Sequence, residues 1–129
     1  MKNPVILIVD GNPRILGFLS KEFADAGFAV ETTGNAETIM EILIRDTISL
    51  LVLDPDLPLH GIKGGIKTGA KTLMEMIESR KPATPVVVYS PYDEYAKDPA
   101  YRSAAAFVEK TGDPNELINT VKQLLMQSA

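Results

Sequence analysis

The chain contains no cysteine, and this absence excludes disulfide bonds, thiol catalysis and cysteine-ligated metal sites. Its single histidine, His60, argues against a zinc site built on imidazole ligands. No apolar run approaches the roughly 20 residues that a membrane-spanning helix needs. The first residues lead directly into a strand-like run and lack the pattern of a secretory signal. We therefore expect a cytoplasmic protein that makes no membrane contact.

The chain also lacks an excess of positive charge, because it contains 17 aspartates and glutamates but only 13 lysines and arginines. The formal net charge of −4 does not favour direct binding to nucleic acid. The composition, with 45% hydrophobic and 23% charged residues over 129 positions, suits one globular domain. We expect residues 1–129 to form that domain around its own core.

Four short apolar runs, rich in β-branched residues, predict strands that are buried on both faces, as in a parallel sheet. They lie at residues 5–9, 50–53, 86–89 and 105–108. A fifth run, at residues 28–32, alternates partly between apolar and polar side chains, which indicates a strand at the edge of the sheet.

Helical patterns separate these runs. Asn12 followed by proline predicts the start of the first helix, and Gly27 predicts its end. Asn35 predicts the cap of a second helix, and residues 113–116 predict the start of the last one. The expected inward side chains are Ile39 and Leu43 in the second helix, and Leu73, Met76 and Ile77 in the third, at residues 71–80.

The fourth connection, between residues 90 and 104, contains two prolines and few apolar anchors, which predicts a short helical element. Strands and helices thus alternate five times. This order predicts an α/β fold with a doubly wound, five-stranded parallel sheet and helices on both faces. In such folds the working site lies at the carboxyl ends of the strands, near the point where strand order reverses.

Polar residues follow four of the predicted strands. Asp10 follows the first strand, Asp54 the third and Ser90 the fourth, and Lys110 lies just after the fifth. Two carboxylates close together favour a hard cation such as Mg²⁺, whose preferred ligands are oxygen atoms. One carboxylate can also act as a nucleophile toward a phosphoryl group, while a hydroxyl and an ammonium group offset its charge.

These residues resemble the receiver domains of two-component response regulators over nearly the whole chain. Val9-Asp10 is similar to the start of that family's acidic pocket, and residues 53–58 (Leu-Asp-Pro-Asp-Leu-Pro) are similar to its phosphoacceptor segment. Phe107 precedes Lys110 by three positions, as the switch aromatic does in the family. The resemblance implies a flavodoxin-like (βα)5 topology with strand order 2-1-3-4-5.

The resemblance also implies roles for particular residues. Asp54 would accept a phosphoryl group from a histidine kinase or a phosphotransfer protein. Asp10, Asp54 and the backbone carbonyl of Asp56 would hold Mg²⁺. Ser90 would be the switch hydroxyl, Lys110 the phosphoryl contact and Phe107 the switch aromatic.

The chain departs from the family pattern after the first strand, in the connection after Pro58, and at Thr111, where the family usually has a proline after the lysine. Gly11 stands where the family has a second acidic residue that touches the metal, so we expect weaker Mg²⁺ binding. Residues 60–67 extend the connection after Pro58 with a stretch rich in glycine and lysine, which we expect to form a loop beside the site. Residues 64–72 come close to a phosphate-binding loop motif, but about ten residues separate them from the preceding strand, which argues against nucleotide binding.

Three functions remain open from the sequence. The first is a phosphorylatable receiver, not an enzyme, whose output is binding to an unidentified downstream protein. The second is a protein-interaction module that works without phosphorylation, which Gly11 favours. The third is a phosphatase that resembles the haloacid dehalogenase superfamily through Asp54-x-Asp56, which we rank last because two strands precede Asp54. A homodimer is left open.

Overall fold

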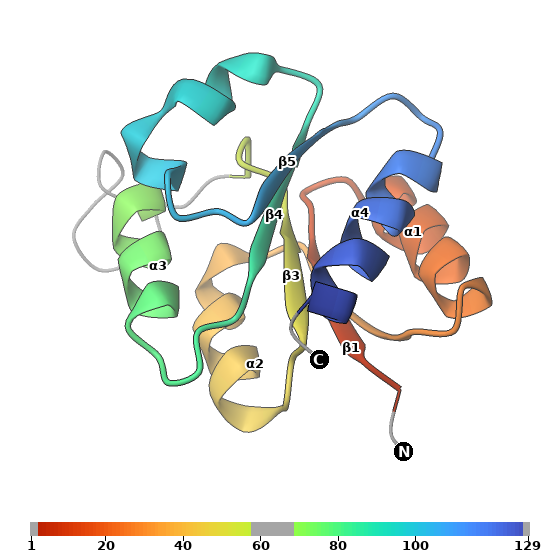
Figure 1. The fold of residues 1–129 in the computed structure, drawn as a ribbon, viewed down its shortest axis with the longest axis horizontal. Helices are drawn as coiled ribbons and strands as arrows, with labels where there is room; N and C mark the ends of the chain where they lie inside the picture. Colours follow the sequence, from red (N-terminus) through yellow and green to blue (C-terminus); the bar gives the residue numbers. More distant parts are fainter. Residues whose placement is uncertain (1–2, 58–68, 128–129) are drawn as a thin grey trace.

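The computed structural model describes residues 3–57 and 69–127, which form a five-stranded parallel sheet with helices on both faces (Figure 1). The strands are β1 (Val5–Val9), β2 (Ala29–Thr33), β3 (Leu50–Leu53), β4 (Val86–Ser90) and β5 (Ala106–Glu109). Their order is β2-β1-β3-β4-β5, so the predicted fold is confirmed. β2 lies at an edge of the sheet, as its partial alternation indicates.

The central strands are apolar on both faces, and each face of the sheet has its own hydrophobic core. Ile8 of β1 packs into one core with Phe23 and Leu117, whereas the next residue, Val9, packs into the other core with Leu43 and Leu73. The first core lies under α1 and α4, and the second lies under α2 and α3 (Figure 1). The helices are α1 (Pro13–Asp25), α2 (Ile39–Arg45), α3 (Gly69–Glu78) and α4 (Asn115–Gln127), with a short 3-10 turn, η1 (Ala36–Thr38), before α2.

Side-chain caps begin the first and last helices. Asn12 Oδ1 accepts a hydrogen bond from the backbone N–H of Arg14 at 3.0 Å, so the predicted cap of α1 is confirmed. Asp113 Oδ1 accepts from the backbone N–H of Asn115 at 3.0 Å, where α4 begins. Gly27 follows α1 with a φ of 99°, a conformation that favours glycine, and so ends that helix.

The inward face of α3 differs from the prediction at one position. Leu73 and Ile77 are buried, but Met76 is 40% exposed, and Met74 is buried in its place. Met74 belongs to the same core as Tyr101 of the fourth crossover. The packing of α3 against that crossover therefore decides which methionine points inward.

The fourth crossover consists of two short 3-10 turns, η3 (Asp93–Lys97) and η4 (Pro99–Tyr101), as its two prolines predict. Tyr101 is nevertheless fully buried. Its ring packs edge-on against Tyr95, with ring centroids 5.9 Å apart and an interplanar angle of 85°. One aromatic residue thus anchors an otherwise irregular segment to the core.

Part of the connection between β3 and α3 lies outside the described residues. The prediction for residues 60–67, and the family match at Pro58, fall within this part of the chain. None of the helices in the described ranges is long and apolar enough to cross a membrane.

Candidate functional site

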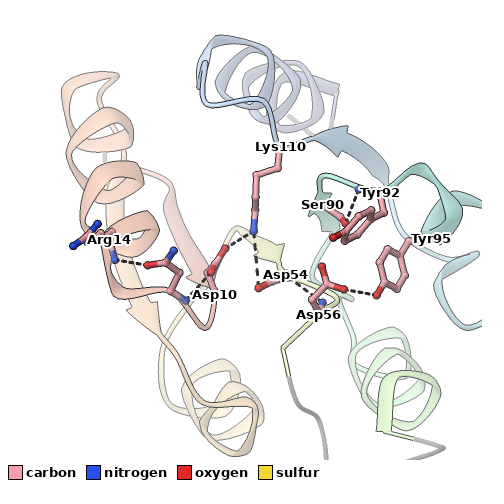
Figure 2. Close-up of polar contacts among 9 residues, drawn as sticks. Asp10, Arg14, Asp54, Asp56, Ser90, Tyr92, Tyr95 and Lys110 are labelled. Carbon is pink, nitrogen blue, oxygen red and sulfur yellow. Dashed lines mark hydrogen bonds and ion pairs between the residues drawn. The ribbon is translucent and has the colours of Figure 1, made fainter.

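The parallel sheet brings the four polar residues singled out above to one edge. β1 pairs with β3, and β3 pairs with β4, so Asp10 and Asp54 follow neighbouring strands. The backbone N–H of Lys110 donates to the carbonyl of Ser90 at 3.0 Å, where β4 and β5 end together. The side chains of Asp10, Asp54 and Lys110 point toward one another, and Ser90 lies on the adjoining strand end (Figure 2).

Asp10 is 2% exposed, and both of its carboxylate oxygens are bonded. Lys110 Nζ donates to Asp10 Oδ2 at 2.8 Å, and the backbone N–H of Asn12 donates to Oδ1 at 2.9 Å. The same Lys110 Nζ lies 3.9 Å from Asp54 Oδ2. The Lys110 ammonium group therefore interacts with two carboxylates, which belong to residues that follow different strands.

Asp54 is buried, with 8% of the residue exposed. Its Oδ1 accepts a hydrogen bond from the backbone N–H of Asp56 at 2.9 Å, and its Oδ2 faces Lys110. Burial raises the pKa of Asp54 above its ordinary value of 3.8, although the Asp56 amide and the Lys110 charge act in the opposite direction. The negative charge of Asp54 is therefore poorly solvated, and Oδ2 remains directed toward the cluster.

Asp10, Asp54 and Lys110 together carry two negative charges and one positive charge, which leaves the cluster at −1. A buried excess of negative charge favours a cation, and carboxylate and carbonyl oxygens are ligands that Mg²⁺ prefers. The two carboxylates and the backbone carbonyl of Asp56 are therefore oxygen ligands of the type that Mg²⁺ prefers. Within residues 3–57 and 69–127, no group of three histidine, cysteine, aspartate or glutamate side chains is arranged to hold a metal ion.

Position 11 has room for a side chain. A Cβ atom added to Gly11 would lie 3.3 Å from Leu57 Cδ1, and a shift of a few tenths of an ångström would relieve this contact. The neighbouring atom is the end of a side chain and not backbone, so the fold itself does not require glycine here. What the site lacks at this position is a carboxylate.

Ser90 is buried beside the cluster, and its Oγ accepts a hydrogen bond from the backbone N–H of Tyr92 at 3.1 Å. Phe107 is 38% exposed and does not join the cluster. Ser90 and Phe107 do line the same open groove, which has a volume of about 310 Å³. The hydroxyl thus lies between the carboxylate cluster and a surface that contains an exposed aromatic ring.

One contact of the site is not predicted by the sequence. The hydroxyl of Tyr95 donates to Asp56 Oδ1 at 2.5 Å (Figure 2). This bond to a carboxylate is the main cause of a raised pKa of the Tyr95 hydroxyl. The two residues are 39 positions apart, and η3 shows no apolar period that predicts where its side chains point.

The comparisons with known proteins agree with this architecture. The family model for the response regulator receiver domain matches residues 6–122, so the chain belongs to that family. It is a receiver domain of the type found in two-component response regulators. Receiver domains are signalling modules, and this membership argues against the phosphatase alternative.

A curated relative is the DNA-binding transcriptional regulator NtrC of Bradyrhizobium sp. (strain RP501 Parasponia). It is 28% identical over 124 residues, which is 95% of this chain and 24% of the relative. The chain thus spans about a quarter of that protein's length.

Solved structures show the same fold. The response regulator TrrA of Thermotoga maritima, in complex with Mg²⁺-BeF, is 27% identical with a TM-score of 0.79, over 96% of this chain and 99% of TrrA. TrrA in complex with the histidine kinase ThkA is 26% identical with a TM-score of 0.76, over 97% and 99%. A CheY-like receiver domain of Methanospirillum hungatei JF-1 has a TM-score of 0.78 at 19% identity, over 98% and 96%, and supports the fold alone.

Proposed function

We propose that this receiver domain accepts a phosphoryl group on Asp54 from a histidine kinase or a phosphotransfer protein. The observation that carries this proposal is the buried Asp54 carboxylate, whose Oδ1 is held by a backbone amide while Oδ2 faces Lys110. Oδ2 would form a bond to phosphorus as the N–P bond of a phosphohistidine breaks, and the histidine nitrogen would keep the electron pair of that bond. The complex of the similar protein TrrA with a histidine kinase supports a donor of this class.

Asp10, Asp54 and the backbone carbonyl of Asp56 would hold Mg²⁺. The ion would offset the negative charge of the carboxylates and of the phosphoryl oxygens. The complex of TrrA with Mg²⁺-BeF supports this assignment. Because residue 11 supplies no carboxylate, we expect the affinity for Mg²⁺ to be lower than in a receiver with two adjacent acidic residues.

Phosphorylation would add negative charge next to Lys110 and Ser90. Lys110 Nζ can turn from Asp10 toward the phosphoryl oxygens, and the Ser90 hydroxyl can leave the amide of Tyr92 to donate to them. Because Ser90 also lines the groove at Phe107, its movement would change a surface that faces solvent. We expect this groove to bind the downstream protein, with an affinity that depends on phosphorylation.

A phosphorylation-independent interaction module is the second candidate. It is favoured by Gly11 and by the state of Asp10, both of whose oxygens are already bonded within the protein. In such a module the groove at Phe107 would bind its partner constitutively. Mg²⁺ binding would then be weak and would not alter partner affinity.

Intact mass spectrometry after incubation with acetyl phosphate and Mg²⁺ separates the two candidates. We expect wild type to gain the mass of one phosphoryl group, and both Asp54→Asn and a metal-free sample to gain none. If wild type shows no gain while a control receiver is labelled by the same donor, Asp54 phosphorylation is wrong and the interaction module is favoured.

A further inference from the structure

The hydrogen bond between Tyr95 and Asp56 joins the segment after Asp54 to the fourth crossover. Figure 2 shows the Asp56 carboxylate between Asp54 and Tyr95, with Oδ1 accepting from the Tyr95 hydroxyl at 2.5 Å. Hydrogen bonds to an ionised acceptor are about twice as strong as those between neutral groups. The Asp56 side chain is therefore held toward Tyr95, on the side away from Asp10.

The position of the Tyr95 hydroxyl is set by the core. The Tyr95 ring packs edge-on against Tyr101, which is fully buried among side chains of α2, α3 and the sheet. This contact involves the ring and not the hydroxyl. A phenylalanine at position 95 can therefore keep the packing while losing the bond to Asp56.

The backbone around Asp56 is held by contacts that do not involve Tyr95. The N–H of Asp56 donates to Asp54 Oδ1 at 2.9 Å, and the N–H of Leu57 donates to the carbonyl of Asp54 at 3.2 Å. Losing the Tyr95 hydroxyl should thus free the Asp56 carboxylate and leave its backbone carbonyl in place. Rotation of one exposed side chain is the only change that this release requires.

We propose that Tyr95 is a positioning residue that withholds the Asp56 carboxylate from the Asp10–Asp54 cluster and thereby sets the Mg²⁺ affinity of the site. When the Tyr95 bond opens, Asp56 becomes a third acidic side chain at a site where Gly11 supplies none. This inference rests on the proposed function, since it concerns the same cation site.

The bond also makes the site sensitive to the position of η3. A partner that moves η3 away from Asp56 would release the carboxylate and tighten Mg²⁺ binding. Because coupling between two binding sites is reciprocal, Mg²⁺ would in turn favour the arrangement in which η3 has separated from Asp56. The fourth crossover would thus act as a regulator of the cation site.

The test is the Mg²⁺ affinity of Tyr95→Phe, measured by isothermal titration calorimetry without any phosphodonor. The variant should bind Mg²⁺ about tenfold more tightly than wild type, because a hydrogen bond to a charged group favours the withheld state by roughly this factor. Tyr92→Phe is the matched control, since it removes a hydroxyl from an exposed ring nearby and keeps the backbone bond to Ser90. Its Mg²⁺ affinity should equal that of wild type.

A double-mutant cycle with Asp56→Asn distinguishes positioning from a structural role. Asp56→Asn retains the backbone carbonyl, and in this background Tyr95→Phe should no longer change the Mg²⁺ affinity. The inference is wrong if Tyr95→Phe binds Mg²⁺ no more tightly than wild type, or if its gain persists in the Asp56→Asn background. If acetyl phosphate labels Asp54 but Tyr95→Phe leaves the affinity unchanged, the Tyr95 inference fails alone. If the affinity rises but no variant is labelled, the inference stands and Asp54 phosphorylation fails.

Discussion

Replacing Gly11 with aspartate should tighten Mg²⁺ binding at the proposed cation site. The cluster of Asp10, Asp54 and Lys110 carries a net charge of −1, and a carboxylate at position 11 would bring it to −2. A third acidic ligand should tighten Mg²⁺ binding on the order of 10- to 100-fold, which corresponds to about 1.4–2.7 kcal/mol.

The same substitution should destabilise the metal-free domain. The new Cβ would lie 3.3 Å from Leu57 Cδ1, and the new carboxylate would repel two buried carboxylates that share one ammonium group. We expect the free energy of unfolding without metal to fall by about 1–3 kcal/mol. Mg²⁺ at 100 times its dissociation constant should restore about 2.7 kcal/mol, because it binds the folded state.

Isothermal titration calorimetry and thermal unfolding, each with and without Mg²⁺, measure both effects. Gly11→Ala is the matched control, since it makes the same contact with Leu57 but adds no charge. Gly11→Asp should show the tighter Mg²⁺ binding and the larger metal-dependent rise in Tm. If Gly11→Asp binds Mg²⁺ no better than Gly11→Ala, position 11 does not face the cation, and our account of the weak site is wrong.

Four further substitutions test the cluster and the core. Lys110→Met should lower the free energy of unfolding by roughly 2–3 kcal/mol in metal-free buffer, measured by urea denaturation, because it leaves the buried Asp10 without its ion pair. Burial raises the pKa of Asp54 above 3.8, so the stability that this group contributes is fully present below about pH 3.8 and is lost as pH rises through the raised pKa. Asp54→Asn should therefore be more stable than wild type at pH 7 in metal-free buffer, and urea denaturation should show that this advantage disappears on acidification below pH 3.8. Met74→Ala should cost about 2–3 kcal/mol of unfolding free energy, whereas Met76→Ala should cost less than about 1 kcal/mol, and equal losses would contradict the orientation of α3.

Sequence patterns predict the sheet well because its central strands, β1, β3 and β4, are buried on both faces. A continuous apolar run such as β3 is stable only at the centre of the sheet, where both of its faces are buried. Its position can therefore be predicted without knowing which elements lie next to it. The face of α3 was harder to predict, because Leu73, Met74, Met76 and Ile77 are all apolar and several helical faces fit them. Contact with the fourth crossover buries Met74, and that contact is tertiary.

The same distinction applies to the site. The sequence allowed us to bring Asp10, Asp54, Ser90 and Lys110 together, because each lies at or just after the end of a strand and parallel strands end at one edge of a sheet. The bond from Tyr95 to Asp56 could not, since η3 has no regular period and Tyr95 is placed by its ring contact with Tyr101. Residues placed by topology are predictable here, and a residue placed by a single side-chain contact is not.

The charge of the cluster explains why phosphorylation of Asp54 should depend on cation binding in this chain. A phosphoryl group on Asp54 replaces one carboxylate charge by a charge of roughly −2, so Asp10, Lys110 and the phosphorylated residue would total about −2 in a largely buried site. Lys110 cannot neutralise both the phosphoryl group and Asp10, because it carries one positive charge. A divalent cation brings the total close to zero. Gly11 and the Tyr95–Asp56 bond would both limit the ligands available to that cation, and in the proposed function they would thereby limit how readily Asp54 keeps a phosphoryl group.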